Sequence, residues 1–349
     1  MKRISAAFMI CAMLLMSAFS FSPSWLFTYG GSLPGYAPQE GTIHESTRPT
    51  DMLEHLEYEE IDRREEGLEL EGRIPYLTQS AGPIHARINS LIDRTVAAKI
   101  SDAREIRSRS LTFNYEAYFS TPYMSIILKS TAATASSKTE VVSINFNVNT
   151  GTLITAEDAV GPHVVQLADR LLLEMIRRDP ERYNSGFSGM RTDQAFSLTD
   201  REITFWFNEF QLAPGFEGII PLSLRLDDIK VITLEPHEYH IREGFNLKMV
   251  PVRIVGDLGY DYFWHPDTRS VSVYHNGEFV IEVTDGINNF VRESRFTRSL
   301  EAAPEFVYGT TYVPISFFDQ ILSLVAFSID DMDNITFASY PVTDAWFER

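Results

Sequence analysis

Imidazole and carboxylate side chains gather in one short segment, where Glu235, His237, Glu238 and His240 lie close together in the chain. These groups are good zinc ligands when they converge on a single ion. Pro236 argues against a helix here, and in an extended segment residues three apart point to opposite faces. The spacing therefore predicts surface or linker histidines and no metal site.

A second cluster of potential cation ligands consists of Asp330, Asp331 and Asp333. Closely spaced aspartates are typical of calcium loops, but an EF-hand also needs a glycine at its sharp turn and a distal glutamate. Neither follows here, so the segment is interpreted as a solvated hairpin turn. We expect no bound metal and no cofactor.

Recognisable catalytic patterns are missing from the sequence. There is no Gly-x-Ser-x-Gly elbow, no phosphate-binding loop, and no paired-aspartate and His-x-x-x-His pattern of polysaccharide deacetylases. The single cysteine, Cys11, lies in the apolar N-terminal run. We therefore expect no catalytic residue. A carboxylate pair for glycoside cleavage stays open, because its separation is a property of the fold.

Aromatic residues offer the remaining chemistry. Phe205 and Trp206 lie in a strand-like run and are predicted to be core residues. Trp264 is also expected in a core, although aromatic rings near strand ends can stack on sugars.

The elements that must position these residues begin with region 73–240. Apolar residues at helical spacing predict two helices, the first with Ile84, Ile88, Leu91, Ile92 and Val96, the second over 164–176. Strands are expected at 125–128, 141–148, 203–207 and 222–226. Because the order shows no repeating βαβ rhythm, the region is predicted to be an α+β module with an antiparallel sheet.

The composition limits the classes of partner. The chain has 349 residues with a formal net charge of −18 and is 44% hydrophobic, enough for one large or two ordinary domains. The negative charge disfavours binding to nucleic acid or to an anionic membrane surface. A cationic partner is the better electrostatic expectation.

The N-terminus resembles a secretory signal over residues 1–20. Lys2 and Arg3 precede an apolar run over 6–16, and small residues follow at Ala18 and Ser20. The run is short for a membrane span, so cleavage and no stable span are expected, with an uncleaved anchor as the alternative. A mature chain without cysteine fits a bacterial exterior.

Residues 21–72 are predicted to be a flexible acidic tether. From residue 40 to 72, about 12 acidic residues stand against three arginines, which predicts a solvated spacer or a bait for a basic partner. Its last part, Leu68-Glu69-Leu70-Glu71, alternates as a strand does, so it could already belong to the first module.

Two stretches of region 73–240 carry a family resemblance. Residues 147–158 read as strand, turn and helix start, and 196–214 contain a strand ending in Phe-Asn before an Ala-Pro turn, with 218–222 as the final strand. The region resembles the extracellular domain of lysozyme-sensing anti-sigma factors and the module preceding some peptidoglycan deacetylase domains. It departs at 131–138, where family members often carry a Gly-Gly-Ala-His loop.

Region 244–340 contains an internal half-repeat. Val250-Pro251 can be laid on Val313-Pro314 at an offset of 63, and each half predicts a short helix and then two strands. With Val250-Pro251-Val252-Arg253, Leu258-Gly259, Trp264 and Tyr312-Val313-Pro314, it resembles the copper amine oxidase N-terminal-like domain of exported Gram-positive proteins. The resemblance implies a smaller β-rich binding or spacer domain of the cell envelope.

The same resemblance does not imply an oxidase. Asn114-Tyr115-Glu116 looks like a topaquinone context, but Leu111 stands where threonine is needed, and the chain has no His-x-His pair.

Taken together, the sequence predicts a non-catalytic, exported cell-envelope protein that binds wall glycan or a cationic protein such as lysozyme. The alternatives are a lysozyme-binding sensor or inhibitor, an accessory subunit of a peptidoglycan-modifying enzyme and, less favoured, a carboxylate-dependent hydrolase. The ligand-binding residues are not predicted.

Overall fold

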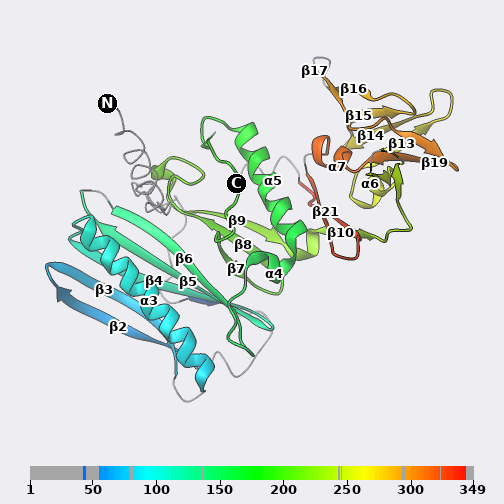
Figure 1. Ribbon diagram of the computed structural model, residues 1–349. Coiled ribbons are helices and arrows are strands. Elements are labelled where there is room, and N and C mark those ends of the chain that lie inside the picture. The colour runs from blue at the N-terminus through cyan, green and yellow to red at the C-terminus, as the bar shows by residue number, and fades with distance from the viewer. Residues whose placement is uncertain are drawn as a thin grey trace, which may run out of the picture.

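A computed structural model describes the part of the chain that carries the fold. The described residues are 42–44, 55–78, 82–135, 137–184, 186–242, 244, 246–292, 296–322 and 324–342. The structure is mostly β, with helices interspersed, and its strands form several separate sheets (Figure 1). The expected signal segment 1–20 lies outside the described residues. No helix among those described is long and apolar enough to span a membrane.

The largest sheet lies in the N-terminal half. Its strands are β1 (Thr42–His44), β2 (Leu56–Glu65), β3 (Leu68–Leu77), β4 (Ser110–Ser120), β5 (Tyr123–Ala133) and β6 (Ser137–Asn147). They follow the order β2-β3-β4-β5-β6, with β1 also on β4. β3 and β1 both run parallel to β4, so the sheet is mixed and the expectation of an antiparallel sheet is wrong at these pairs.

The crossover helix α3 (Pro83–Glu105) explains the parallel pair, because parallel neighbours need a long connection and a helix supplies it. Proline occupies the first turn, where its missing N–H costs nothing. The predicted row Ile88, Ile92 and Val96 is buried against the sheet. The first predicted helix is therefore confirmed, and it covers one face of the sheet (Figure 1).

Glycine at position 72 permits the close approach of β3 to β4. A Cβ there would lie 1.9 Å from the backbone oxygen of Phe113, and the φ of Gly72 is +117°. The β3–β4 pairing ends at this residue, and β1 pairs with β4 further along, at Glu116 to Tyr118.

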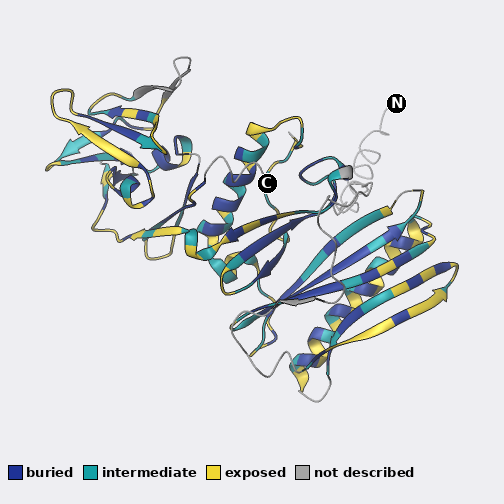
Figure 2. Ribbon diagram, turned by 180° about the vertical axis from the view of Figure 1, so that it is seen from behind, coloured by how far each residue is buried: buried dark blue, intermediate teal, exposed yellow. Residues whose placement is uncertain are grey.

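The expectation of a flexible tether over 21–72 is wrong for residues 56–72. These residues form β2 and the first half of β3, which pair as an antiparallel hairpin. Leu56, Ile61, Leu68 and Leu70 are buried in the same core as α3, while the intervening acidic residues stay exposed (Figure 2). Acidic residues at alternate positions are thus the solvent face of a half-buried hairpin.

A smaller layer covers the other face of the large sheet. It contains the antiparallel sheet β7 (Ala195–Leu198), β8 (Glu202–Phe207) and β9 (Ile220–Arg225), the helices α4 (Ala156–Val160) and α5 (Pro162–Arg178), and 3-10 turns at Gly215–Glu217 and Leu226–Asp228. Trp206 packs on Ile127 and Val141 of the large sheet. The apolar side of α5 packs on β7, β8 and β9, which confirms the second predicted helix.

The C-terminal region is built from short strands and two short helices. In chain order these are β10 (Lys230–Leu234), β11 (His240–Arg242), β12 (Leu247–Pro251), α6 (Ile254–Asp257), β13 (Asp261–His265), β14 (Ser270–His275), β15 (Glu278–Thr284), β16 (Asn289–Arg292), β17 (Phe296–Ser299), β18 (Glu305–Val307), β19 (Thr310–Pro314), α7 (Ser316–Gln320), β20 (Val325–Ile329) and β21 (Ile335–Ser339). The sheets are β11-β12-β19-β18, β13-β14-β15, β10-β21-β20 and β16-β17.

The half-repeat appears as two copies of a strand, a short helix and a two-stranded hairpin: β12-α6-β13-β14 and β19-α7-β20-β21. β12 pairs antiparallel with β19, and Val250 lies directly opposite Val313, its own counterpart at the offset of 63 (313 − 250). Met249 faces Pro314, and Pro251 faces Tyr312. The copies are therefore related by a local two-fold axis through the valine pair.

The expected boundary between 73–240 and 244–340 needs one correction. β10, assigned to the first module, pairs along its whole length with β21, the last strand of the second. Helix α5 packs on β20 and β21, and Arg170 of α5 forms an ion pair with Asp319. In Figure 1, β10 and β21 lie beside α5 and join the two parts of the molecule.

Candidate functional site

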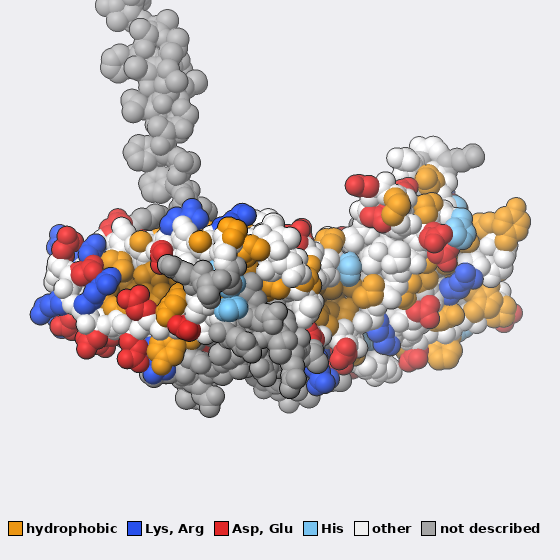
Figure 3. Space-filling model, turned by 90° about the horizontal axis from the view of Figure 1, so that it is seen from below, with side chains coloured by type: hydrophobic (Ala, Val, Ile, Leu, Met, Phe, Trp, Pro, Cys, Tyr) orange, Lys and Arg blue, Asp and Glu red, His pale blue; other side chains and the backbone are white. Residues whose placement is uncertain are grey.

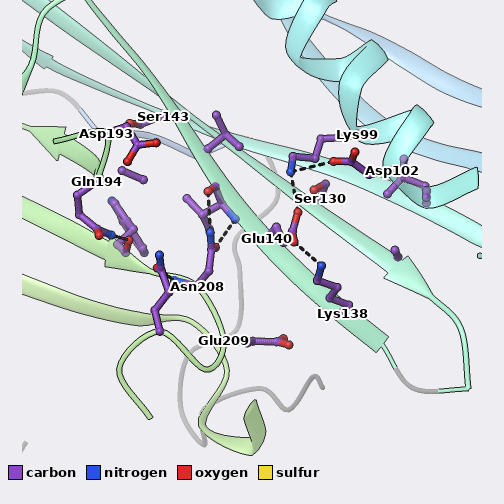
Figure 4. A pocket seen from close by; sticks show the side chains of 18 of the residues that line it. Lys99, Asp102, Ser130, Lys138, Glu140, Ser143, Asp193, Gln194, Asn208 and Glu209 are labelled. Carbon is purple, nitrogen blue, oxygen red and sulfur yellow. Dashed lines mark hydrogen bonds and ion pairs between the residues drawn. The ribbon is translucent and has the colours of Figure 1, made fainter. Parts of the chain in front are cut away.

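A cleft of about 370 Å³ runs along β6, an edge strand of the large sheet. The end of α3 supplies Lys99 on one side, and the chain before β7 and after β8 supplies Arg191 and Glu209 on the other. Figure 4 shows Lys99 on the helix side of β6, and Asn208 and Glu209 on the side of the smaller sheet. We call this feature the β6 cleft.

The segment after β8 closes the exposed edge of β6. Asn208 acts as a strand would, because its Oδ1 accepts from the Val141 N–H at 2.7 Å and its Nδ2 donates to the Val141 carbonyl at 3.3 Å. An unpaired sheet edge invites unwanted strand pairing, and side chains of this kind block it. The Phe-Asn motif of the sequence thus has a structural role.

Glu209, the next residue, is the unusual group in the β6 cleft. It is 2% exposed, and its Oε1 accepts from the Thr139 N–H at 3.2 Å. Oε2 is buried and makes no hydrogen bond with any described residue. Burial raises the pKa of this carboxyl to about 7, against smaller opposing effects of the Thr139 hydrogen bond and the Lys138 charge. Phe210, which follows, has a φ of +62°, a conformation that costs free energy for a non-glycine residue.

The other charged residues of the β6 cleft neutralise one another. Glu140 binds Lys138 at 2.5 Å and Lys99 at 2.6 Å, and Lys99 also lies 3.5 Å from Asp102. Although burial opposes ionisation of Glu140, the two lysines more than compensate and hold its pKa below the usual value. The carboxyls of Glu140 and Glu209 therefore have pKa values shifted in opposite directions within one cleft.

Arg191 and Asp193 complete the charged lining. The guanidinium donates to both carboxylate oxygens, at 2.7 and 2.8 Å. The hydrogen bonds from Arg191 lower the pKa of Asp193. Every cation lining the cleft is thus already bound to a carboxylate.

A second candidate surface lies on the outer side of the sheet β13-β14-β15. The rings of Phe263 and Phe279 are 57% and 54% exposed. Tyr274 lies between them, with ring centroids 5.5 Å from Phe263 and 5.6 Å from Phe279, both in edge-to-face geometry. We call these residues, together with the polar row beside them, the aromatic face.

The polar row crosses the same three strands. His265 Nε2 lies 2.9 Å from the Ser272 hydroxyl, which donates to Glu282 at 3.0 Å. Because Phe263 pairs with Ser272 in the sheet, the aromatic and polar groups are adjacent. In Figure 3 hydrophobic side chains reach the surface at the right-hand end of the molecule.

The local two-fold axis shows what distinguishes this face. Its counterpart is the outer side of β10-β21-β20, where α5 covers Ala326 and its cross-strand partner Ala338. Both alanines are fully buried, whereas Phe263, which corresponds to Ala326 at the offset of 63, is exposed. One copy of the repeat therefore has its outer face covered by a helix of the chain, and the other presents large side chains to solvent.

The structure divides the histidine cluster of the sequence between two places. His237 lies 3.3 Å from Glu235 in an exposed turn, whereas His240 lies 3.4 Å from Glu305. Glu238 accepts a hydrogen bond from the backbone of Glu235. Among the described residues no group of three histidine, cysteine or acidic side chains is placed to hold a metal ion.

The aspartate cluster forms the expected turn between β20 and β21. Asp330 accepts backbone hydrogen bonds from Met332 and Asn334, both at 2.9 Å. Asp333 binds Lys248 at 2.7 Å, and this contact lowers the pKa of Asp333.

Two aromatic predictions have different outcomes. Phe205 and Trp206 are buried, as expected, and the Trp206 indole donates to Ser197 at 3.1 Å. The core position expected for Trp264 is wrong, since its ring is 38% exposed and stacks on Phe306 with centroids 4.8 Å apart. β13 is an edge strand, so no further strand covers this side of the tryptophan.

The topaquinone-like triplet has a structural role instead. Glu116 is 3% exposed and binds the ammonium of Lys129 at 2.5 Å, while Tyr118 also donates to Glu116. Lys129 lies 5.0 Å from the ring centre of Trp206, so the pair holds the two layers together.

The comparisons with known proteins concern two parts of the chain. Residues 244–330 match the family model of the copper amine oxidase N-terminal domain. This confirms the resemblance drawn from the Val-Pro and Leu-Gly motifs of that region. No curated protein matches the chain.

Two crystal structures are similar to part of the chain. Both are DUF3298-family proteins, one from Bacteroides fragilis and one from Pseudomonas aeruginosa, at 13% and 12% identity. Each alignment covers 49% of this chain, 91% and 90% of the respective relatives, and has a TM-score of 0.37. A likeness at this level supports no functional statement, and the anti-sigma-factor resemblance of region 73–240 stays a prediction.

Sequence reasoning missed Glu209 and the aromatic face. Glu209 stood inside the recognised Phe-Asn motif, but its burial depends on contact with β6, some 70 residues earlier. For Phe263, the available signal was its correspondence with the small residue Ala326 at the same position of the other half of the repeat.

Proposed function

We propose that this chain is an exported cell-envelope protein that binds wall glycan without cleaving it, through the aromatic face. The observation that carries the proposal is the exposed row of Phe263, Tyr274 and Phe279 beside hydrogen-bonding groups. Sugar rings present apolar C–H faces and hydroxyl edges, so they suit a surface that offers apolar rings together with donors and acceptors.

Two further points support a binding role. The aromatic face belongs to the region that matches the copper amine oxidase N-terminal domain. The sequence of the chain contains neither the quinone-forming pattern nor the copper-ligating pattern of an oxidase. The short N-terminal apolar run supports export, although it lies outside the described residues.

The test is sedimentation with insoluble peptidoglycan. Purified protein should pellet with the glycan, and Phe263→Ala and Phe279→Ala should each reduce the bound fraction. Tyr308→Ala is the matched control, because Tyr308 is a fully exposed aromatic residue in another loop of the same domain. Equal loss in all three variants, or no loss in the first two, would contradict glycan binding at the aromatic face. Soluble fragments released by the protein would show hydrolysis instead.

A cationic protein such as lysozyme is the second candidate partner. The observation that favours it is the β2–β3 hairpin, where residues 56–77 hold eight acidic and three basic side chains. Titrating lysozyme into the intact protein and into a deletion of residues 21–54, at two salt concentrations, tests this. The deletion removes β1 but preserves β2, so binding that survives it and persists in moderate salt belongs to the rest of the folded part.

A further inference from the structure

The β6 cleft contains one carboxyl whose charge has no counter-ion. Glu209 lines the cleft. Its Oε2 is buried and has no hydrogen-bond partner among the described residues. We infer that the β6 cleft is a binding site for an organic cation, a guanidinium or ammonium group, which pairs with Oε2 of Glu209. This site lies away from the aromatic face and does not depend on glycan binding.

The missing partner must be a cation or a strong donor, because the charges already present are matched. Lys138 and Lys99 are bound to Glu140, and Arg191 is bound to Asp193. Lys138 is near enough to Glu209 to lower its pKa, yet its ammonium is held by Glu140. Ionised Glu209 therefore adds a single unmatched negative charge to the lining.

The physical cost of that charge explains why the site would bind a cation. An isolated carboxylate is strongly disfavoured away from water, so the group retains its proton when the cleft is free. A guanidinium brought to Oε2 supplies both the opposite charge and a directional donor, which favours the ionised form. Binding should therefore release a proton at pH values where free Glu209 is protonated.

The surroundings suit a side chain or small molecule of this kind. The volume of about 370 Å³ lies in the range of ligand pockets. The charged groups that act on Glu209 are Lys138 and Glu140 from β6. The other charged residues of the lining are Lys99 and Asp102 from the end of α3, and Arg191 and Asp193 before β7. All of these except Glu209 are in ion pairs, so Glu209 is the group whose protonation couples to binding.

The experiment uses titration calorimetry of the full protein with N-acetyl-arginine amide. The matched ligand control is the citrulline analogue, which has the same shape and no charge. Since Glu209 ionises near pH 7, its ionised fraction and the observed affinity should both rise about tenfold between pH 6 and pH 8. Buffers of different ionisation enthalpy should reveal proton release at pH 6 that is nearly absent at pH 9.

Glu209→Gln should weaken binding at pH 8 at least tenfold and remove its pH dependence. Glu238→Gln removes the same charge from an exposed turn and should change neither the affinity nor its pH dependence, which controls for general attraction to an acidic protein. The proposal is overturned by equal affinity for arginine and citrulline probes, by absence of binding, or by unchanged binding in Glu209→Gln. If that variant does not fold, proton release by the natural protein still decides the matter.

Discussion

Replacing the buried carboxyl of Glu209 with the amide in Glu209→Gln changes how the stability of the free protein depends on pH. The carboxyl titrates near pH 7 in the folded chain, compared with 4.5 for an unperturbed glutamate. The native state thus holds this proton more tightly than the unfolded state does. The stabilisation of the folded protein by this bound proton is complete below pH 4.5 and is lost as the pH rises through 7.

The magnitude follows from the size of the shift. Each pKa unit corresponds to about 1.4 kcal/mol, so the folded protein loses roughly 3 kcal/mol relative to its low-pH value by pH 8. An amide has the shape of the protonated carboxyl and does not ionise. Glu209→Gln should therefore gain up to about 3 kcal/mol over the natural protein between pH 4 and pH 8.

Urea denaturation from pH 4 to pH 8.5, followed by tryptophan fluorescence, measures this difference. Glu140→Gln is the matched control in the same cleft and should show the opposite sign. The lysines lower the pKa of Glu140, so its contribution is present at neutral pH and is lost on acidification. If the free energies of unfolding of Glu209→Gln and of the natural protein differ by the same amount over the whole pH range, the reasoning is refuted.

Four further outcomes are expected. Lys129→Met should destabilise the protein by roughly 3 to 5 kcal/mol, measured by thermal unfolding, because it leaves Glu116 buried without its cation. Fragment 229–349 should unfold cooperatively in urea and be more stable than fragment 243–349, which lacks β10. Phe279→Ala should weaken glycan binding about fivefold in sedimentation without lowering the melting temperature, because the ring is half exposed. The intact mass of protein recovered from culture supernatant or wall fractions should correspond to a chain that begins after Ser20; a product that keeps Met1 would contradict export with cleavage.

Patterns that depend on neighbours in the sequence predicted much of the fold. Ile88, Ile92 and Val96 gave the correct helix face, since helical spacing is local. The half-repeat was also recoverable, because a strand, a short helix and a hairpin recur with nearly the same spacing. The acidic hairpin was mistaken for a tether because high charge favours a solvated reading, although Leu68 and Leu70 already alternated.

The candidate sites were less accessible to prediction. The shifted pKa of Glu209 requires contact with Thr139, and the exposure of Phe263 requires that no helix cover its sheet. Both are properties of contacts between distant segments. β10 was assigned to the wrong part of the chain for the same reason, since a strand's partner is not encoded by its own residues.

The pairing of Val250 with Val313 places two units of similar structure around one local two-fold axis. The two units carry different packing constraints on their outer faces. A larger residue at Ala326 would push α5 away, whereas a substitution at Phe263 disturbs no interior packing. The outward strands β13 to β15 are therefore free to acquire new specificities by point mutation, while the inward copy keeps the domain attached.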